Sequence, residues 1–206
     1  MTETSSNPTE VDPVARELLQ SVVDTARAIF GAEASSIFLL DEEADELVFQ
    51  AVSGQGEDFL VGMRFPAGRG IAGWVASTGE PMVVDDLSRN GSFARDLAES
   101  TKYVPDSLMA APLMHASGVL GVLEVLDPAP QARSSLGELD LLALFARQAA
   151  TALRAVLDRR AALDRAAAAG SAEASAAARA LAELDEAGRA AGLRVVDAVR
   201  ELLLAR

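Results

Sequence analysis

Three carboxylates stand where a binding site could use them. Asp85 and Asp86 follow one apolar segment, and Glu124 interrupts another, residues 119–126. A carboxylate inside an apolar strand costs on the order of several kcal/mol in desolvation unless it has a partner. Carboxylates beside an apolar pocket would select a ligand that is positively charged or donates hydrogen bonds. In the structural alternative, Asp85 and Asp86 end a strand and cap the next turn, while Glu124 pairs with an arginine such as Arg69.

Other reactive side chains are few. His115 is the only histidine and lies beside a turn, so it suits neither a multi-histidine metal site nor a haem ligand. Cysteine is absent, which excludes disulfides, thiolate nucleophiles and thiolate-bound metals. Arg64 and Arg69 flank a glycine loop ahead of a helix, which could hold an anion, but there is no GxxxxGK[ST] phosphate loop. We therefore expect no enzyme activity and neither a metal nor a cofactor.

The strands that would position these groups are indicated by their hydrophobic patterns. Residues 109–127 form two apolar segments joined by a tight turn at 116–118, which is typical of a hairpin. The second segment is apolar on both faces, so it belongs at the centre of a sheet. Residues 36–40 and 47–52 form another hairpin around a charged turn, and residues 81–85 form a further strand.

Two helices flank these strands in the sequence. The first covers residues 14–30, with Asp12 as N-cap and Pro13 at the first helical position. Its expected apolar stripe comprises Val14, Leu18, Val22, Ala26 and Ile29. A glycine-rich loop, residues 62–70, leads to a short helix that Gly79 closes. The expected buried side of this helix comprises Ile71, Ala72, Val75 and Ala76.

A long helix begins at Leu136 and leads into an extension of different composition. Its apolar positions fall at heptad-like steps: Leu142, Phe145, Ala149, Ala152, Val156 and Leu163. Residues 161–206 contain 18 alanines in 46 positions, with an expected break at Gly170 and Ser171. A second seam comprises Leu181, Leu184, Gly188, Ala191, Val195, Ala198 and Leu202. The extension can continue the helix, turn back as a hairpin, or pair with a second chain as a coiled coil.

Length and charge set outer limits on organisation and partners. The chain has 206 residues, enough for one domain at 14–160 with an alanine-rich helical extension at 161–206, after a disordered tail at 1–13. The net charge is -13, and residues 1–160 carry 24 acidic and 12 basic side chains, a net -12. Such acidity argues against nucleic acid and anionic membrane surfaces as partners. Neither a secretory signal nor an apolar membrane span is visible, so we expect a cytoplasmic protein.

Three sequence segments together resemble the GAF domain family. They are GRGIAGWVASTGEPMVVDDL at 68–87, AAPLMHASGVLGVLEVLD at 110–127 and SSIFLLDEEADELVFQAVSG at 35–54. The resemblance implies an α+β fold: a six-stranded antiparallel sheet with helices on both faces. The first and last helices would cover one face. On the other face, the short helix and the irregular segment 87–106, itself with a short helix near 93–100, would roof a pocket. Members of this family are mostly small-molecule sensors and dimerising modules, and few are enzymes.

The family's best-known ligands fit this sequence poorly. Its cyclic-nucleotide-binding members carry an Asn-Lys…Phe…Asp-Glu signature, for which the nearest residues are Asn90, Phe93 and Asp96. Gly91 replaces the lysine and no glutamate follows Asp96, so a polar loop with a helix cap is favoured. Covalent bilin attachment and the sulfoxide reductase activity of some members both need cysteine, which the chain lacks.

The resemblance therefore predicts a sensor with an unidentified small ligand. The candidate pocket residues are Phe38, Arg69, Trp74, Asp86, Phe93, Met109 and Glu124. Aromatic and methionine side chains at such positions are also typical of a plain core. We expect a homodimer, formed through the helices that begin at 14 and 136, which passes a change in helix packing to a protein signalling partner. The alternative is a pocketless scaffold that dimerises without any ligand.

Overall fold

The computed structural model describes residues 13–57, 59–91, 94–100, 103–129 and 136–183, together with the single positions 194, 197 and 201. The chain divides into two compact units, Met1–Asp158 and Arg159–Arg206. The first unit contains the sheet and all the sites discussed below. The predicted tail falls outside the described residues except for Pro13, which is the first residue of helix α1.

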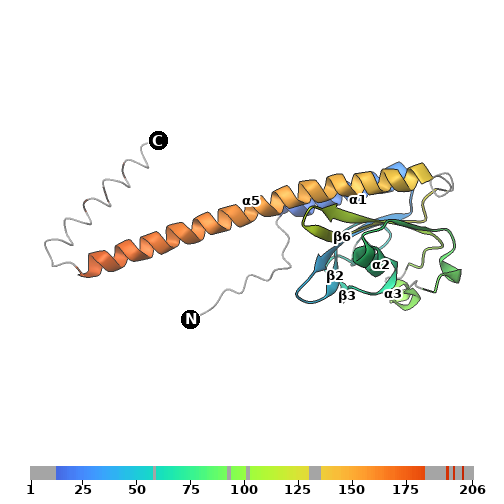
Figure 1. The fold of residues 1–206 in the computed structure, drawn as a ribbon, viewed down its shortest axis with the longest axis horizontal. Helices are drawn as coiled ribbons and strands as arrows, with labels where there is room; N and C mark the ends of the chain where they lie inside the picture. The colour runs from blue at the N-terminus through green and yellow to red at the C-terminus, as the bar shows by residue number, and fades with distance from the viewer. Residues whose placement is uncertain are drawn as a thin grey trace. The chain divides into compact units, whose positions relative to one another are not determined.

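The first unit is built on one six-stranded antiparallel sheet, as predicted (Figure 1). The strands are β1 (Ala34–Asp41), β2 (Glu46–Gly54), β3 (Arg64–Pro66), β4 (Met82–Val84), β5 (Leu108–His115) and β6 (Gly118–Leu126). Their order is β3-β2-β1-β6-β5-β4, so β6 has the central position that its apolar sequence predicts. The loop prediction for residues 62–70 is wrong in one respect, because β3 lies within it and pairs with β2.

The register of β6 decides which of its side chains reach each face of the sheet. Glu124 lies opposite Ser36 of β1 and Ala110 of β5, and residues paired in this way point to the same face. The neighbours of Glu124 in the strand, Leu123 and Val125, point to the other face. A strand covered on both sides thus contributes to two separate cores.

Helix α1 (Pro13–Phe30) and the first part of helix α5 (Leu136–Glu183) lie side by side on one face of the sheet (Figure 1). The largest fully buried side chains of this core are Leu19, Phe30, Ile37, Met109, Leu113, Leu123, Leu142 and Leu153. The extent of α1 is predicted correctly, but the face that it buries is not. Val14 and Ile29 are 59% and 52% exposed.

The buried stripe of α1 is rotated from the predicted one. It comprises Ala15, Leu19, Val22, Val23, Ala26 and Phe30. Val22 and Ala26 belong to both stripes, since the apolar arc of the helix is wider than one core contact can cover. The sequence pattern gives the helix and its period, and the sheet selects one side of the arc.

Helix α5 also differs from its prediction. It is continuous over 48 residues and passes through Gly170 and Ser171, where a break is predicted. Its buried positions are Leu142, Ala146, Ala149, Ala150 and Leu153, while Phe145, Ala152 and Val156 are half-buried and Leu163 is exposed. Every residue of α5 at positions 159–176 is exposed. The side chains of the second predicted seam, at 181–202, lie outside the described residues.

The opposite face of the sheet carries α2 (Gly70–Thr78), the short 3-10 helix η1 (Leu87–Arg89) and α3 (Arg95–Ser100). Gly79 ends α2 as predicted, in a left-handed conformation (φ 71°), and its N–H donates to the carbonyl oxygen of Val75. Beneath these helices lies a second core, in which the rings of Phe38, Phe49 and Phe65 contact one another at centroid separations of 4.4 to 5.8 Å.

Helix α2 packs directly on the preceding loop because position 73 has no side chain. A Cβ at Gly73 would lie 2.5 Å from the carbonyl oxygen of Ala67 and 2.6 Å from the carbonyl carbon of Gly68. Both are backbone atoms, so neither can move aside alone. The glycine thus sets how closely α2 approaches residues 67 and 68 of the preceding loop.

We expect Gly73→Ala to destabilise the domain by about 1–3 kcal/mol, because the clash outweighs the gain in helix propensity, which is at most about 1 kcal/mol. Urea unfolding measures the difference. Gly68→Ala is the matched control, since an added Cβ there meets nothing within 4 Å. Equal stability of the two variants would contradict the close packing of α2.

Candidate functional site

A cavity of about 90 Å³ lies between the second face of the sheet and helices α2 and α3. Its wall is mainly apolar and includes Phe38, Phe49, Leu60, Phe65, Ile71, Ala98 and Leu108. The polar residues that line it are Ser35, Ser36, Gln55, Arg69, Tyr103 and Glu124. Ser35 pairs with Val125, so its side chain points to the other face of the sheet. Mostly apolar walls with a few polar groups are typical of small-molecule sites.

Glu124 is the unusual group in this wall. Its side chain comes from the central strand and is only 9% exposed. Within the described residues, its carboxyl group has no hydrogen-bond or ion-pair partner, although its backbone oxygen accepts from Ser35 Oγ at 2.9 Å. Burial raises the pKa of this carboxyl to about 7, because the charged form loses its hydration.

The arginine that could neutralise Glu124 is occupied elsewhere. Arg69, at the N-cap position of α2, pairs with Asp96 of α3 at the surface. The structural alternative, in which Glu124 pairs with Arg69, is therefore not what the structure shows. Arg69 still lines the cavity, and its ion pair joins the two helices that cover it.

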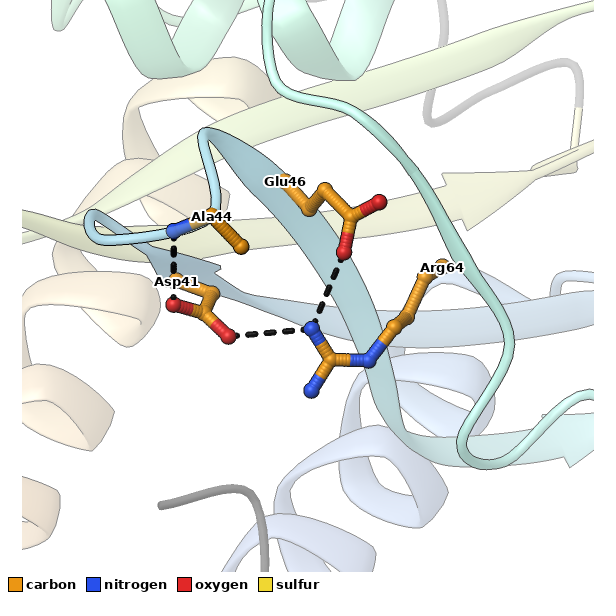
Figure 2. A network of polar contacts seen from close by, with 4 residues as sticks. All are labelled: Asp41, Ala44, Glu46 and Arg64. Carbon is orange, nitrogen blue, oxygen red and sulfur yellow. Dashed lines mark hydrogen bonds and ion pairs between the residues drawn. The ribbon is translucent and has the colours of Figure 1, made fainter. Parts of the chain in front are cut away.

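The second arginine of the predicted anion site is also engaged by carboxylates. Figure 2 shows Arg64 of β3 between Asp41 and Glu46, with N–O distances of 2.9 and 3.0 Å. The hydrogen bond from Arg64 holds the pKa of Asp41 below its usual range, helped by a second bond from the backbone N–H of Ala44. This network ties β3 to the β1–β2 hairpin, and neither arginine is left open for an anion.

A polar network at the end of β6 braces the wall beside Tyr103. Asp127 accepts hydrogen bonds at Oδ1 from the N–H groups of Asp106 and Ser107, at 3.0 and 2.9 Å, and from Ser107 Oγ at 3.1 Å. Its Oδ2 accepts from the Tyr103 hydroxyl. Burial and this bond raise the pKa of Tyr103. The sequence pattern predicts no role for either residue, although Tyr103 is the only tyrosine and Asp127 ends the strand motif at 110–127.

Comparison with known proteins identifies the family. The sequence model of the GAF domain matches residues 15–153. The chain belongs to the GAF domain family. This is a family of small-molecule-binding regulatory modules, and the six-stranded sheet with a long C-terminal helix is its fold.

Solved structures that are similar to this GAF domain share its fold at low identity. The GAF domain of a phosphoenolpyruvate-protein phosphotransferase from Coxiella burnetii superimposes with a TM-score of 0.65 at 20% identity, covering 74% of this chain and 90% of that one. The corresponding domain from Acinetobacter gives 0.61 at 20% identity, with 73% and 88% covered.

A curated relative in sequence is a probable 3',5'-cyclic phosphodiesterase, pde-5, of Caenorhabditis elegans. It is 27% identical over 115 residues, which are 52% of this chain and 16% of that protein. The chain thus spans less than a fifth of this relative.

The GAF cavity brings together three of the seven predicted site residues: Phe38, Arg69 and Glu124. Phe93 lies outside the described residues. The remaining three predictions are not supported, because these side chains lie elsewhere. Trp74 is 37% exposed on α2 and is not part of the cavity wall.

Asp86 and Met109 lie outside the cavity wall for different reasons. Asp86 caps η1, since its Oδ1 accepts from the Ser88 N–H at 3.0 Å, which is the structural alternative given above. Met109 is fully buried in the core beneath α1 and α5, because it pairs with Val125 and shares its face. Asp85 is exposed, so the three carboxylates do not form one site.

His115 lies at the end of β5, where its Nδ1 is 3.3 Å from Ser117 Oγ. In the part of the chain that the structure describes, no three His, Asp or Glu side chains gather closely enough to bind a metal ion. The same part contains no helix that is long and apolar enough to span a membrane.

We expect Glu124→Gln to stabilise the domain at pH 8 by about 3 kcal/mol and to change little at pH 5. The carboxyl binds its proton more tightly in the folded protein, with a pKa of about 7 against an ordinary 4.5. Unfolding therefore releases protons between these values, and the stability of the unsubstituted protein falls as the pH rises through this window. Glutamine has the same shape and no charge. Urea unfolding at the two pH values measures the effect.

Glu80→Gln is the control, since it removes an exposed carboxylate and should leave the pH profile of stability unchanged. If Glu124→Gln retained the decline between pH 5 and pH 8, another group would be responsible for it.

Proposed function

We propose that this GAF domain is a non-catalytic signalling module that binds a small molecule in the cavity under α2 and α3. The observation that carries the proposal is an apolar cavity whose wall contains a buried carboxyl group, Glu124, without a partner among the described residues. A domain selected only for stability would fill such a space or pair such a group. The pocketless scaffold is the alternative, and the open cavity weighs against it.

The ligand that we propose is not a cyclic nucleotide, although the curated relative is named as a cyclic phosphodiesterase. A cyclic phosphate is an anion, and it would meet the Glu124 carboxyl. The one arginine among the described residues of the wall, Arg69, is paired with Asp96. The cyclic-nucleotide signature is also broken at Gly91. In addition, the cavity of about 90 Å³ is small for a nucleotide.

The second part of the proposal is homodimerisation through α1 and α5. Val14, Ile29, Leu141 and Leu144 are 45% to 59% exposed on these two helices, which lie on the same face of the sheet. Large apolar side chains left exposed on two helices of one face are what an interaction surface would bury. A second copy of the chain, meeting the same helices, would cover them.

Strand β6 offers a physical route from the cavity to this helical face. Glu124 lines the cavity, whereas Leu123 and Val125 pack against the core that contains α1 and α5. A ligand that shifts the strand backbone at Glu124 must also move these two neighbours. We propose that the resulting change in helix packing passes along α5 to a protein partner.

Native mass spectrometry of freshly purified protein, with thermal-shift screening of a metabolite library, tests the sensing function. We expect a co-purified small molecule, or a compound that raises the Tm by several degrees, since a ligand that binds only the folded state stabilises it. Ala98→Leu places a larger side chain in the cavity wall and should abolish the effect. Ala161→Leu, at an exposed position of α5, is the control. A library without any hit on the unsubstituted protein would favour the scaffold.

Sedimentation at micromolar concentration tests the dimer. We expect the unsubstituted chain to sediment as a dimer and Leu144→Glu as a monomer, because a charge would replace an apolar side chain at the interface. Val61→Glu changes a valine that is 49% exposed on a loop outside both helices, and it should remain a dimer. A monomeric unsubstituted chain would contradict this part of the proposal while leaving ligand sensing intact.

A further inference from the structure

We infer that the cavity takes a small organic cation, with an ammonium or amidinium head against Glu124 and a short apolar body against the phenylalanine rings. This inference rests on the proposed sensing function and specifies the chemical class of its ligand. Both the sign of the charge and the size of the ligand follow from the residues of the wall.

The charge of the ligand follows from what Glu124 lacks. A carboxylate in an apolar wall is stabilised by a positive charge or by strong hydrogen-bond donors. Arg69 supplies neither, because it pairs with Asp96. The hydroxyl of Tyr103 donates to Asp127, and that of Ser35 donates to the backbone of Glu124. Ser36 and Gln55, the other polar residues of the wall, form no bond with the Glu124 carboxyl. Among the described residues no donor reaches this carboxyl, so a donor carried by the ligand would complete the site.

A second polar group lies beside the carboxyl. Ser36 is directly opposite Glu124 in the β1–β6 pairing and is only 4% exposed. Side chains opposite each other in an antiparallel pair have Cβ atoms about 5 Å apart. The Ser36 hydroxyl is thus placed to accept a further hydrogen bond from a head group that has several donors. An ammonium or amidinium group has them, and a halide or a carboxylate has none.

The remaining wall sets the body of the ligand. Phe38, Phe49 and Phe65 form a continuous aromatic cluster that lines the same cavity. Its volume of about 90 Å³ is well below the roughly 150 Å³ of an engineered cavity that admits benzene. This space suits a ligand whose charged head group is joined to an apolar body of about three to five carbon atoms. The net charge of -12 over residues 1–160 also attracts cations to the domain and repels anions.

A titration of the whole chain with three isosteric probes, followed by NMR of the backbone amides that line the cavity, tests the inference. The probes are butylammonium, 1-butanol and butyrate at pH 8, where the carboxyl is mostly ionised. We expect butylammonium to bind at least about tenfold more tightly than 1-butanol, with butyrate weakest, since a charge-assisted hydrogen bond contributes about that factor.

Two variants make the result specific to Glu124. Glu124→Gln keeps the shape of the side chain and should reduce butylammonium binding by about tenfold, to the level of 1-butanol. Asp85→Asn removes an exposed carboxylate that the sequence placed in the same candidate site, and it should bind butylammonium like the unsubstituted chain.

The possible failures are distinguishable. If 1-butanol and butylammonium shift the cavity amides equally, or if Glu124→Gln keeps the preference for the cation, the inference is wrong and the sensing function stands. If none of the three probes shifts these amides up to its solubility limit, both the cation inference and the cavity-based function fail.

Discussion

The constraint on which the rest of the structure depends is that the central strand has no solvent face. β6 is paired on both edges, and helices cover the sheet on both sides, so each side chain from Val122 to Val125 must be accommodated in a core or a cavity. For Leu123 and Val125 this is favourable, since burial removes apolar surface from water. For Glu124 it is not, because no protein group in the described chain compensates the buried carboxyl. This uncompensated carboxyl lies in the wall of the cavity.

An uncompensated carboxyl in a strand that is otherwise ideal for its place is difficult to explain by stability alone. Alanine, valine or glutamine would satisfy the pairing with Ser36 and Ala110 without the penalty of desolvating a charge. Functional sites are the places where sequences depart from the locally best choice. Of the ionisable side chains among the described residues of the cavity wall, Arg69 and Tyr103 are held by protein partners, and Glu124 is not. The proposed function therefore rests on this one side chain.

The sequence predicts the fold well and the site in part, and the difference has a physical basis. The β5–β6 hairpin, the cap at Gly79 and the roofed face depend on local patterns and on a resemblance that covers most of the domain. Which face of the sheet a single side chain points to depends on the register of its strand in the folded protein. Met109 is assigned to the wrong face because a shift of one residue in a strand exchanges the two faces. The predictions for Trp74 and for the buried stripe of α1 are wrong because each helix is rotated about its axis relative to the predicted orientation. The sequence does not predict strand β3, because three residues are too few to show an alternating pattern and only pairing with β2 makes them a strand.

The alternation of side chains between the two faces of β6 explains how one strand can serve both parts of the proposed function. Glu124 faces the cavity, and its two neighbours face the helices, so the site and the apolar helical surface are separated by the thickness of a single strand. Such contiguity does not by itself establish coupling, because a ligand shifts an equilibrium only by its difference in affinity between two states. Glu124 supplies a source for such a difference. Its negative charge is destabilising when the cavity is empty, and a bound cation would compensate it. A rearrangement that lets this carboxyl move toward water would therefore be favoured without the ligand and disfavoured when the ligand is bound. Where that rearrangement shifts the strand backbone, Leu123 and Val125 move with it, and they share a core with α1 and α5.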